Sequence, residues 1–340
     1  MRRWAVRVLQ GAAGTAALFL AAELLSSAWL DAPLVDRTPL VEVEPSALTG
    51  YRLRPLQESF TYQASVQTNA QGLRERTWTA TEAAGRRVLF VGGSETFGKG
   101  VAVEDAFPRQ VEQRTQGRLR SVNAGTPDWN LEQSLAFIEA EASRYRPHVI
   151  VLSLAWDDLF VDASMHAQPV APEREGGQWF VRRWATQSGA LRWLAPVYTR
   201  SRVLCAARNA LKSSWARHQG LPSYVWRQAL LNDETTPELE QAWGRAQAQL
   251  KAWAQRAHSQ DYEAWLLIHV FEQQVRGERW GFQRRARAAA AQAGLQVIDP
   301  SPCYKGGVDL FIPYDGRPSV QGHGCIAGAV HRALSYQQTP

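Results

Sequence analysis

The sequence of 340 residues contains only three cysteines and two methionines, and no internal repeat period runs through it. Three cysteines are too few for a disulfide framework, although an oxidising compartment would permit one bridge. No cluster of cysteine and histidine has the spacing of a zinc site. We therefore expect neither a metal nor another cofactor.

Composition indicates a folded chain of ordinary size. Apolar residues make up 45% and charged residues 21% of the sequence, which excludes global disorder and allows one large domain or two small ones. The net charge of +6 comes from 38 basic and 32 acidic residues. Because this excess is modest, it does not indicate a nucleic-acid-binding protein.

The N-terminal segment has the pattern of a membrane signal. Residues 8–30 are mostly apolar and follow an arginine cluster, and at 1.5 Å per residue they are long enough to cross a layer of roughly 30 Å. Arginines before the segment favour a cytoplasmic N-terminus and an extracytoplasmic, periplasmic remainder. Residues 1–30 are thus expected to form an uncleaved signal anchor, with a signal peptide removed near Ala28 as the alternative. Glu23 is costly in such a segment, so it either lies near the outer interface or contacts a partner helix.

The rest of the chain divides into an arm and a regular domain. Residues 31–84 are rich in Pro, Thr and Gln and predict an extended arm, with a turn at residues 69–74. Residues 85–335 alternate short apolar strands with amphipathic helices, which predicts a parallel sheet covered by helices on both faces. The expected strands are residues 88–91, 121–122, 149–154, 265–270 and 295–298, and the expected helices are residues 107–116, 130–145, 236–257 and 278–293.

An insertion at about residues 160–232 interrupts this pattern. Between Gly176 and Asn232 there are nine basic residues and five tryptophans but no acidic residue. Such a surface suits anionic lipid, an acidic glycan or a partner protein, whereas an exported domain rarely meets nucleic acid. The alternative is a helical subdomain with tryptophans in its core and solvated arginines.

Four segments with polar or glycine residues follow the expected strands. The first, VLFVGGSETFGKGV, ends a strand on Gly92 and Gly93 and presents Ser94 at its carboxyl end, where open α/β sheets place their ligand sites. The others are NAGTPDWN, LSLAWDDLF and YDGRPSVQGHGCIAGAV. Cys303 precedes the last of them and Cys325 lies within it, and these two cysteines are the pair expected to form a disulfide.

Together the four segments resemble the motifs of the SGNH (GDSL-type) hydrolases, in the order that this family has them, over roughly residues 49 to 335. The resemblance implies a three-layer α/β/α SGNH-hydrolase-like fold, here preceded by an N-terminal transmembrane helix. It implies that Ser94 is the nucleophile, that Asp315 orients a base, and that Ser94 and Gly125 donate to the oxyanion. A serine hydroxyl needs such a base to accept its proton.

Two positions depart from the family pattern. Asp157 stands where the family has an oxyanion-binding asparagine, and an ionised carboxylate accepts hydrogen bonds but donates none. Arg317 stands where the family has its histidine, and a guanidinium is no base; it would instead pair with Asp315 or Asp157, or hold an anion. His323, six residues later, is the candidate replacement for the base, and His269 is a second candidate.

Two functions follow from these residues. The first is a catalytically silent SGNH domain that serves binding or assembly in the cell envelope. The second is an active serine esterase or O-acyltransferase on envelope glycan or lipid, with Ser94, Asp315 and His323 as its catalytic residues and Ser94, Gly125 and Asp157 around the oxyanion. Both place the protein at the membrane, and the resemblance implies a membrane partner of the O-acyltransferase kind.

Overall fold

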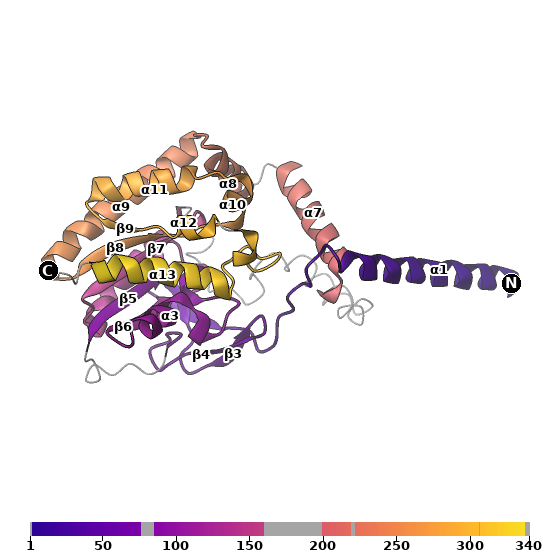
Figure 1. Cartoon of the computed structure of the whole chain (residues 1–340), viewed down its shortest axis with the longest axis horizontal. Coiled ribbons are helices and arrows are strands. Elements are labelled where there is room, and N and C mark those ends of the chain that lie inside the picture. Colours follow the sequence, from indigo (N-terminus) through magenta and orange to yellow (C-terminus); the bar gives the residue numbers. More distant parts are fainter. Residues whose placement is uncertain (1, 76–84, 160–198, 219–221, 306, 337–340) are drawn as a thin grey trace. The chain divides into compact units, whose positions relative to one another are not determined.

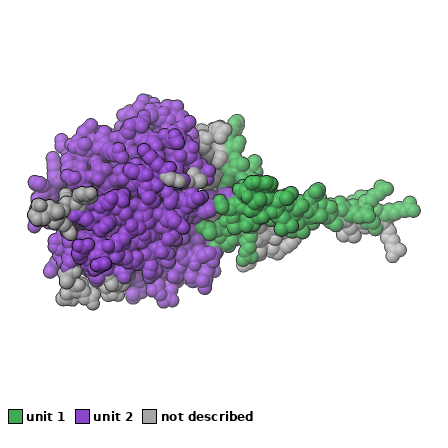
Figure 2. Space-filling view, in the orientation of Figure 1, with its two compact units in different colours: residues 1–35, 176–221 green, residues 36–175, 222–340 purple. Residues whose placement is uncertain are grey.

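The computed structural model describes residues 2–75, 85–159, 199–218, 222–305 and 307–336. The chain divides into two compact units, which Figure 2 colours separately: residues 1–35 with 176–221, and residues 36–175 with 222–340. Residues 160–198 of the predicted insertion and residues 76–84 of the predicted arm lie outside the described residues.

The larger unit is built on a five-stranded parallel sheet. Its strands lie in the order β6-β5-β7-β8-β9, and every pairing is parallel. They are β5 (Arg86–Gly92), β6 (Leu119–Gly125), β7 (Val149–Leu154), β8 (Glu263–Ile268) and β9 (Gln296–Ile298). All six residues of β7 are buried, as expected for a central parallel strand covered on both faces. The predicted α/β fold with a parallel sheet is confirmed.

Helices cover both faces of this sheet and complete three layers (Figure 1). Leu89 and Ile150 point into one core, whereas their chain neighbours Val88 and Val149 point into the other, because successive strand residues face opposite sides. The first core is closed by α4 (Leu131–Glu141), α8 (Pro222–Asn232), α9 (Pro237–Ser259) and α11 (Gly281–Ala293), and the second by α3 (Phe107–Arg114), α12 (Ser301–Tyr304) and α13 (Val320–Tyr336).

Local sequence signals set the helix ends. Asn130 begins α4 with a capping box to Gln133, and the Thr236 hydroxyl accepts from the Leu239 amide at the start of α9. Gly294 ends α11 in the left-handed conformation, with φ of 75°. The remaining short elements of this unit are α2 (Ser94–Phe97), η1 (Val103–Asp105), η2 (Ala142–Tyr145), η3 (Asp157–Leu159), α10 (Glu272–Gly277) and η6 (Val308–Leu310).

Helix α8 belongs to the main core although its sequence lies within the predicted insertion. Its residues Ala229, Leu230 and Leu231 are buried in the first core cluster. The basic, tryptophan-rich composition of residues 176–232 concealed this short apolar run. The helix therefore packs with the α/β domain from residue 222 onward.

The predicted extended arm is two β-hairpins. Strands β1 (Val43–Ser46) and β2 (Gly50–Leu53) pair antiparallel, as do β3 (Glu58–Thr61) and β4 (Ala64–Gln67). The predicted turn follows them, and its Arg74 is fully buried. The Arg74 guanidinium donates to the carbonyls of Phe97 and Gly98 at 3.0 and 2.6 Å, and also to those of Ser65 and Val101. One side chain thus ties the hairpins to the loop behind α2.

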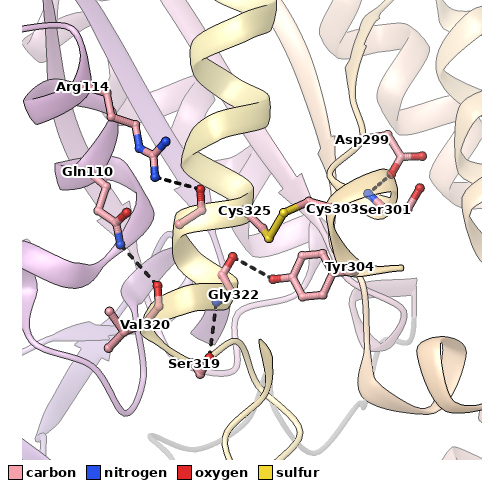
Figure 3. The surroundings of a disulfide bond; sticks show 11 residues. Gln110, Arg114, Asp299, Ser301, Cys303, Tyr304, Ser319, Val320, Gly322 and Cys325 are labelled. Carbon is pink, nitrogen blue, oxygen red and sulfur yellow. Dashed lines mark hydrogen bonds between the residues drawn. A yellow bond between two sulfur atoms is a disulfide. The ribbon is translucent and has the colours of Figure 1, made fainter. Parts of the chain in front are cut away.

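The disulfide between Cys303 and Cys325 links α12 to α13 across a Cα–Cα distance of 5.7 Å (Figure 3). The Tyr304 hydroxyl supports the same contact by donating to the Gly322 carbonyl at 3.0 Å. Ser319 begins α13 and accepts from the Gly322 amide. Cys205, the remaining cysteine, is a buried free thiol.

The smaller unit contains helix α1 (Arg2–Ser26) and helix α7 (Arg202–His218). The side chains of Leu18, Leu20, Leu24 and Leu25 on α1 are exposed. In the part of the chain that the structure describes, we find no helix that combines the length and the apolarity needed to span a bilayer.

Candidate functional site

Three of the four motifs meet at one edge of the sheet. Gly92 at the end of β5 pairs with Gly125 at the end of β6, and Val91 pairs with Leu152 of β7. Helix α2 begins at Ser94 directly after β5, and η3 begins at Asp157 after β7. The carboxyl ends of these neighbouring strands therefore carry the polar residues of the candidate site.

Close packing of α2 explains the glycines of two motifs. A Cβ atom at Gly92 would lie 2.6 Å from the Thr96 hydroxyl oxygen and 2.7 Å from the Ser153 Cβ. A Cβ at Gly125 would lie 2.2 Å from the Phe97 amide nitrogen. Any larger residue at these positions would displace the helix that begins with Ser94.

The Ser94 hydroxyl contacts an acid and a cation. Its Oγ donates to Oδ1 of Asp128 at 3.3 Å, accepts from the Asp128 amide at 3.3 Å, and accepts from Nη2 of Arg317 at 3.4 Å. The two acceptor sites of the hydroxyl are thus directed at donors. Among the described residues, the carboxylate of Asp128 is the one acceptor that this hydroxyl contacts for its proton.

Arg317 lies at the centre of an ion-pair network. Its Nη1 donates to Oδ2 of Asp315 at 2.8 Å, and its Nη2 lies 3.7 Å from Oδ1 of Asp128. Asp315 also accepts a hydrogen bond from the hydroxyl of Tyr62, which follows β3 in the second hairpin. Asp315 therefore orients a guanidinium, where the family resemblance implied that it would orient an imidazole.

The charges of the site keep Arg317 protonated. Although desolvation lowers it, the pKa of Arg317 rises above its ordinary value because Asp315, Glu95 and Asp128 surround the guanidinium. Desolvation raises the pKa of Asp315, but the neighbouring Arg317 and the Tyr62 hydrogen bond lower it below its ordinary value overall. At neutral pH this pair is an ion pair. The guanidinium cannot accept the proton of Ser94, and the hydrogen bonds of Asp315 are with Arg317 and Tyr62.

The acidic residues beside α2 add further negative charge. Desolvation, with Asp157 nearby, raises the pKa of Glu95 to about 7. Desolvation also raises the pKa of Asp157, and the neighbouring Arg317 opposes the rise. Asp158, which follows it, is buried and accepts from the Ala155 amide at 2.7 Å. Among the described residues no group of His, Cys, Asp and Glu is arranged to hold a metal ion.

Of the predicted oxyanion donors, the Gly125 amide already donates within the chain, and the Asp157 side chain carries acceptor oxygens in place of a donor. The amide of Gly125 donates to Oδ1 of Asn123 at 2.9 Å, two residues before it in β6. Asp157 presents carboxylate oxygens, which repel a developing oxyanion unless they are protonated. Of the three groups assigned to this role, only the backbone of Ser94 has neither obstacle.

The structure does not bring His323 to Ser94. His323 is fully buried in the first turns of α13, where Nδ1 accepts from the Phe107 amide at 3.3 Å and its ring stacks on Phe107. Its Nε2 has no hydrogen-bond partner among the described residues. His269 lies on another side of Phe107, with ring centroids 6.0 Å apart, and its two ring nitrogens likewise have no partner within the described chain. Ser319 starts α13 only after Arg317, which places His323 beyond the site.

Three residues of the site, Asp128, Tyr62 and Glu95, were not among those predicted from the sequence. Asp128 lies within the quoted motif NAGTPDWN, yet nothing in its spacing marks it as a partner of Ser94. Tyr62 precedes Asp315 by 253 positions, and only the fold brings the two together. Glu95 directly follows Ser94, and a carboxylate next to the expected nucleophile was the one signal that sequence alone offered.

Comparisons with known proteins return only solved structures. No family model and no curated protein matches the chain. Solved structures with a similar fold include TesA, with 16% identity, a TM-score of 0.43, and coverage of 74% of this chain and 99% of that one. The esterase EstA from Pseudoalteromonas sp. has 10% identity, a TM-score of 0.43, and coverage of 75% and 100%.

A protein from Slackia heliotrinireducens that is assigned to the SGNH hydrolases has 11% identity, a TM-score of 0.37, and coverage of 74% and 100%. Because these TM-scores lie below 0.5, we base no argument about activity on them. The parallel sheet and the motif residues at its carboxyl edge are features of this chain itself, and they give it an SGNH-hydrolase-like fold.

Proposed function

We propose that this protein is a catalytically silent SGNH-type domain that serves binding or assembly in the cell envelope. The observation that supports this most directly is the hydrogen bond from Arg317 to Ser94, because the donor lies where a base would have to accept. Asp315 holds the guanidinium in place, so the arrangement is a stable ion pair at neutral pH.

The expected increase in the barrier to hydrolysis also favours a catalytically silent domain. Removal of a single oxyanion donor from a serine hydrolase costs about 2.7 to 4 kcal/mol of barrier, and each 1.36 kcal/mol is tenfold in rate. Here the Gly125 amide is engaged by Asn123, Asp157 is acidic, and no imidazole contacts Ser94 within the described residues; the acceptor of its hydroxyl proton is the carboxylate of Asp128. The combined loss would leave hydrolysis many orders of magnitude slower than in an intact site.

The proposed location is the extracytoplasmic side of a membrane, with residues 1–30 as an uncleaved anchor. The arginine cluster before residues 8–30 supports this orientation. The disulfide between Cys303 and Cys325 also favours an oxidising compartment, because cytosolic thiols are kept reduced. In that location the partners are an envelope glycan or lipid and a membrane protein of the O-acyltransferase kind.

One observation favours the alternative of an active serine esterase or O-acyltransferase. The Ser94 hydroxyl donates to Asp128, whose side chain is 36% exposed, so this carboxylate is the one group placed to take its proton. A carboxylate is a weaker base than an imidazole for a serine hydroxyl, and Arg317 lies 3.7 Å from the same carboxylate. We therefore rank this alternative second.

A fluorophosphonate probe tests the proposal, because it labels only activated serines. We expect no labelling of the full-length protein, and the same result with Ser94→Ala. A serine hydrolase of known activity in the same detergent serves as the positive control. Labelling that disappears in Ser94→Ala would overturn the silent assignment, and further loss in Asp128→Asn would then identify the base.

A further inference from the structure

Glu23, the acidic residue within the apolar N-terminal segment, begins helix α7. Its Oε1 accepts from the Arg202 amide at 2.6 Å, and its Oε2 accepts from the Ser201 hydroxyl at 2.8 Å and the Val203 amide at 3.3 Å. The first amides of a helix have no partner within the helix, and a carboxylate there also suits the helix dipole. The partner of Glu23 is thus a helix of the same chain.

Helix α7 presents an apolar stripe to solvent. Leu204, Leu211 and Trp215 lie seven and then four positions apart, a spacing that places them on one helix face. Their side chains are 37%, 71% and 57% exposed. Cys205, about 100° around the helix from Leu204, is buried, so α7 already packs through a neighbouring face and leaves this stripe exposed.

The positive charge of α7 indicates the kind of surface that covers its apolar stripe. Helix α7 contains Arg202, Arg208, Lys212 and Arg217 and no acidic residue, and none occurs anywhere between Gly176 and Asn232. A basic helix with leucine and tryptophan on one face is typical of helices that lie in the interface of an anionic bilayer. Tryptophan itself prefers the headgroup region.

The position of Glu23 along α1 determines how far from the end of α1 helix α7 begins. Glu23 lies three residues before α1 ends at Ser26, or about 4.5 Å along the helix axis at 1.5 Å per residue. If α1 is the membrane anchor, α7 therefore begins within about one helical turn of the anchor's outer end. Figure 1 shows α7 meeting α1 at that end and then leading away from it.

We propose that α7 lies on the outer leaflet of the membrane, with Leu204, Leu211 and Trp215 inserted between anionic lipid headgroups and Glu23 fixing its start. The inference rests on the proposed anchoring of residues 1–30. It adds a second, surface-lying membrane contact to the anchor and assigns a lipid surface to helix α7 of the basic segment.

Spin labels test this arrangement in the full-length protein. A label at Leu211→Cys is compared with one at Leu48→Cys, an exposed leucine of the larger unit, both in a Cys205→Ala background so that no other thiol reacts. The protein is reconstituted into phosphatidylcholine vesicles with or without phosphatidylglycerol. The measurement is the accessibility of each label to oxygen, which partitions into lipid, and to a water-soluble nickel complex.

With phosphatidylglycerol present, we expect the label at 211 to shift toward oxygen accessibility and the label at 48 to stay accessible to nickel. In phosphatidylcholine alone the label at 211 should return toward water. A label at 211 that is equally accessible to nickel in both vesicles, or that is shielded from both reagents, would overturn the inference; shielding would indicate a protein partner. Flotation of the vesicles measures anchoring separately, so protein that floats while 211 stays in water refutes the inference but not the anchor.

Discussion

The Arg317 guanidinium donates to the Ser94 hydroxyl across 3.4 Å, and Asp315 accepts from the same guanidinium at 2.8 Å. The order of residues, an acid, an intermediate group and a serine, is that of a catalytic triad. The middle group, however, is permanently charged and can only donate. The order of the three groups resembles that of a hydrolase triad, but a guanidinium cannot accept the proton of Ser94 as an imidazole would.

This relationship predicts that activity can be restored by substitution. In Arg317→His with Asp157→Asn, an imidazole would lie between Asp315 and Ser94, and an amide donor would replace the acidic side chain. We expect Ser94 to become reactive toward a fluorophosphonate and toward a short-chain nitrophenyl ester. The rate of labelling, compared with the unsubstituted protein, measures the gain.

Two control variants show whether any gain comes from the new imidazole and from Ser94. Arg317→Gln removes the guanidinium without supplying a base, so it should remain unlabelled. Ser94→Ala added to the double variant should abolish any gain. If the double variant folds and stays unreactive, the engaged Gly125 amide is the remaining defect, and the pocket has diverged beyond its two substituted side chains.

The Asp315 ion pair should contribute measurably to stability. Asp315→Asn leaves Arg317 without its closest carboxylate, and because the pair is mostly but not fully buried we expect a loss of about 2 kcal/mol in the free energy of unfolding. The exposed Asp309→Asn should change it by less than about 0.5 kcal/mol. Urea unfolding measures both.

The pH dependence of this loss has a definite sign. The folded pKa of Asp315 is lowered, so its stabilisation is present above the ordinary value of 3.8 and is lost as the pH falls through the folded pKa. The difference between the two proteins should therefore shrink in acid. A difference that is independent of pH would mean that the amide disrupts packing and that the ion pair contributes little.

Arg74 should be the most sensitive residue of the hairpin region. Four carbonyl oxygens accept from its guanidinium, and Arg74→Met would remove all four hydrogen bonds; the carbonyls of Phe97 and Gly98 would keep only longer bonds, from the Asn123 side chain and the Val101 amide. We expect a loss of about 3 kcal/mol, since each unsatisfied buried group costs about 1 kcal/mol or more. Arg52→Met, which removes an exposed ion pair with Glu44, should cost less than about 1 kcal/mol. Equal effects would show that the hairpins dock through apolar contacts alone.

The sequence predicted the parts of the fold that local chemistry determines. The apolar run of β7, the capping residues Asn130 and Thr236 and the terminating Gly294 each act within a few residues, so their pattern was visible. The substitution at Arg317 was visible for the same reason, because it lies two residues after Asp315. The disulfide between Cys303 and Cys325 followed from their places around one motif.

Contacts between distant segments were not predictable in this way. Tyr62 reaches Asp315 only because the hairpins form and dock, and Glu23 reaches α7 from 179 positions away. The first amides of α7 are capped by a carboxylate from α1, which no local residue of α7 indicates. The engagement of the Gly125 amide depends on the rotamer of Asn123, which no sequence pattern specifies.

Two buried histidines, His269 and His323, pack against the ring of Phe107 and should make the stability of the fold sensitive to acid. Desolvation lowers the pKa of His269, and that of His323, from 6.5 to about 3. A histidine whose folded pKa is depressed stabilises the fold fully above its unfolded pKa of 6.5 and loses this contribution as the pH falls below that value. For one such group the free energy of unfolding should fall by about 2 kcal/mol between about pH 7 and pH 5, since each pKa unit corresponds to about 1.36 kcal/mol.

The imidazole of His269 has no hydrogen bond to lose within the described residues. His269→Leu should therefore remove roughly half of the decrease in unfolding free energy between about pH 7 and pH 5. His258→Leu, at an exposed position, should retain the whole decrease. An unchanged slope in His269→Leu would assign acid sensitivity to the carboxylates around Arg317 instead.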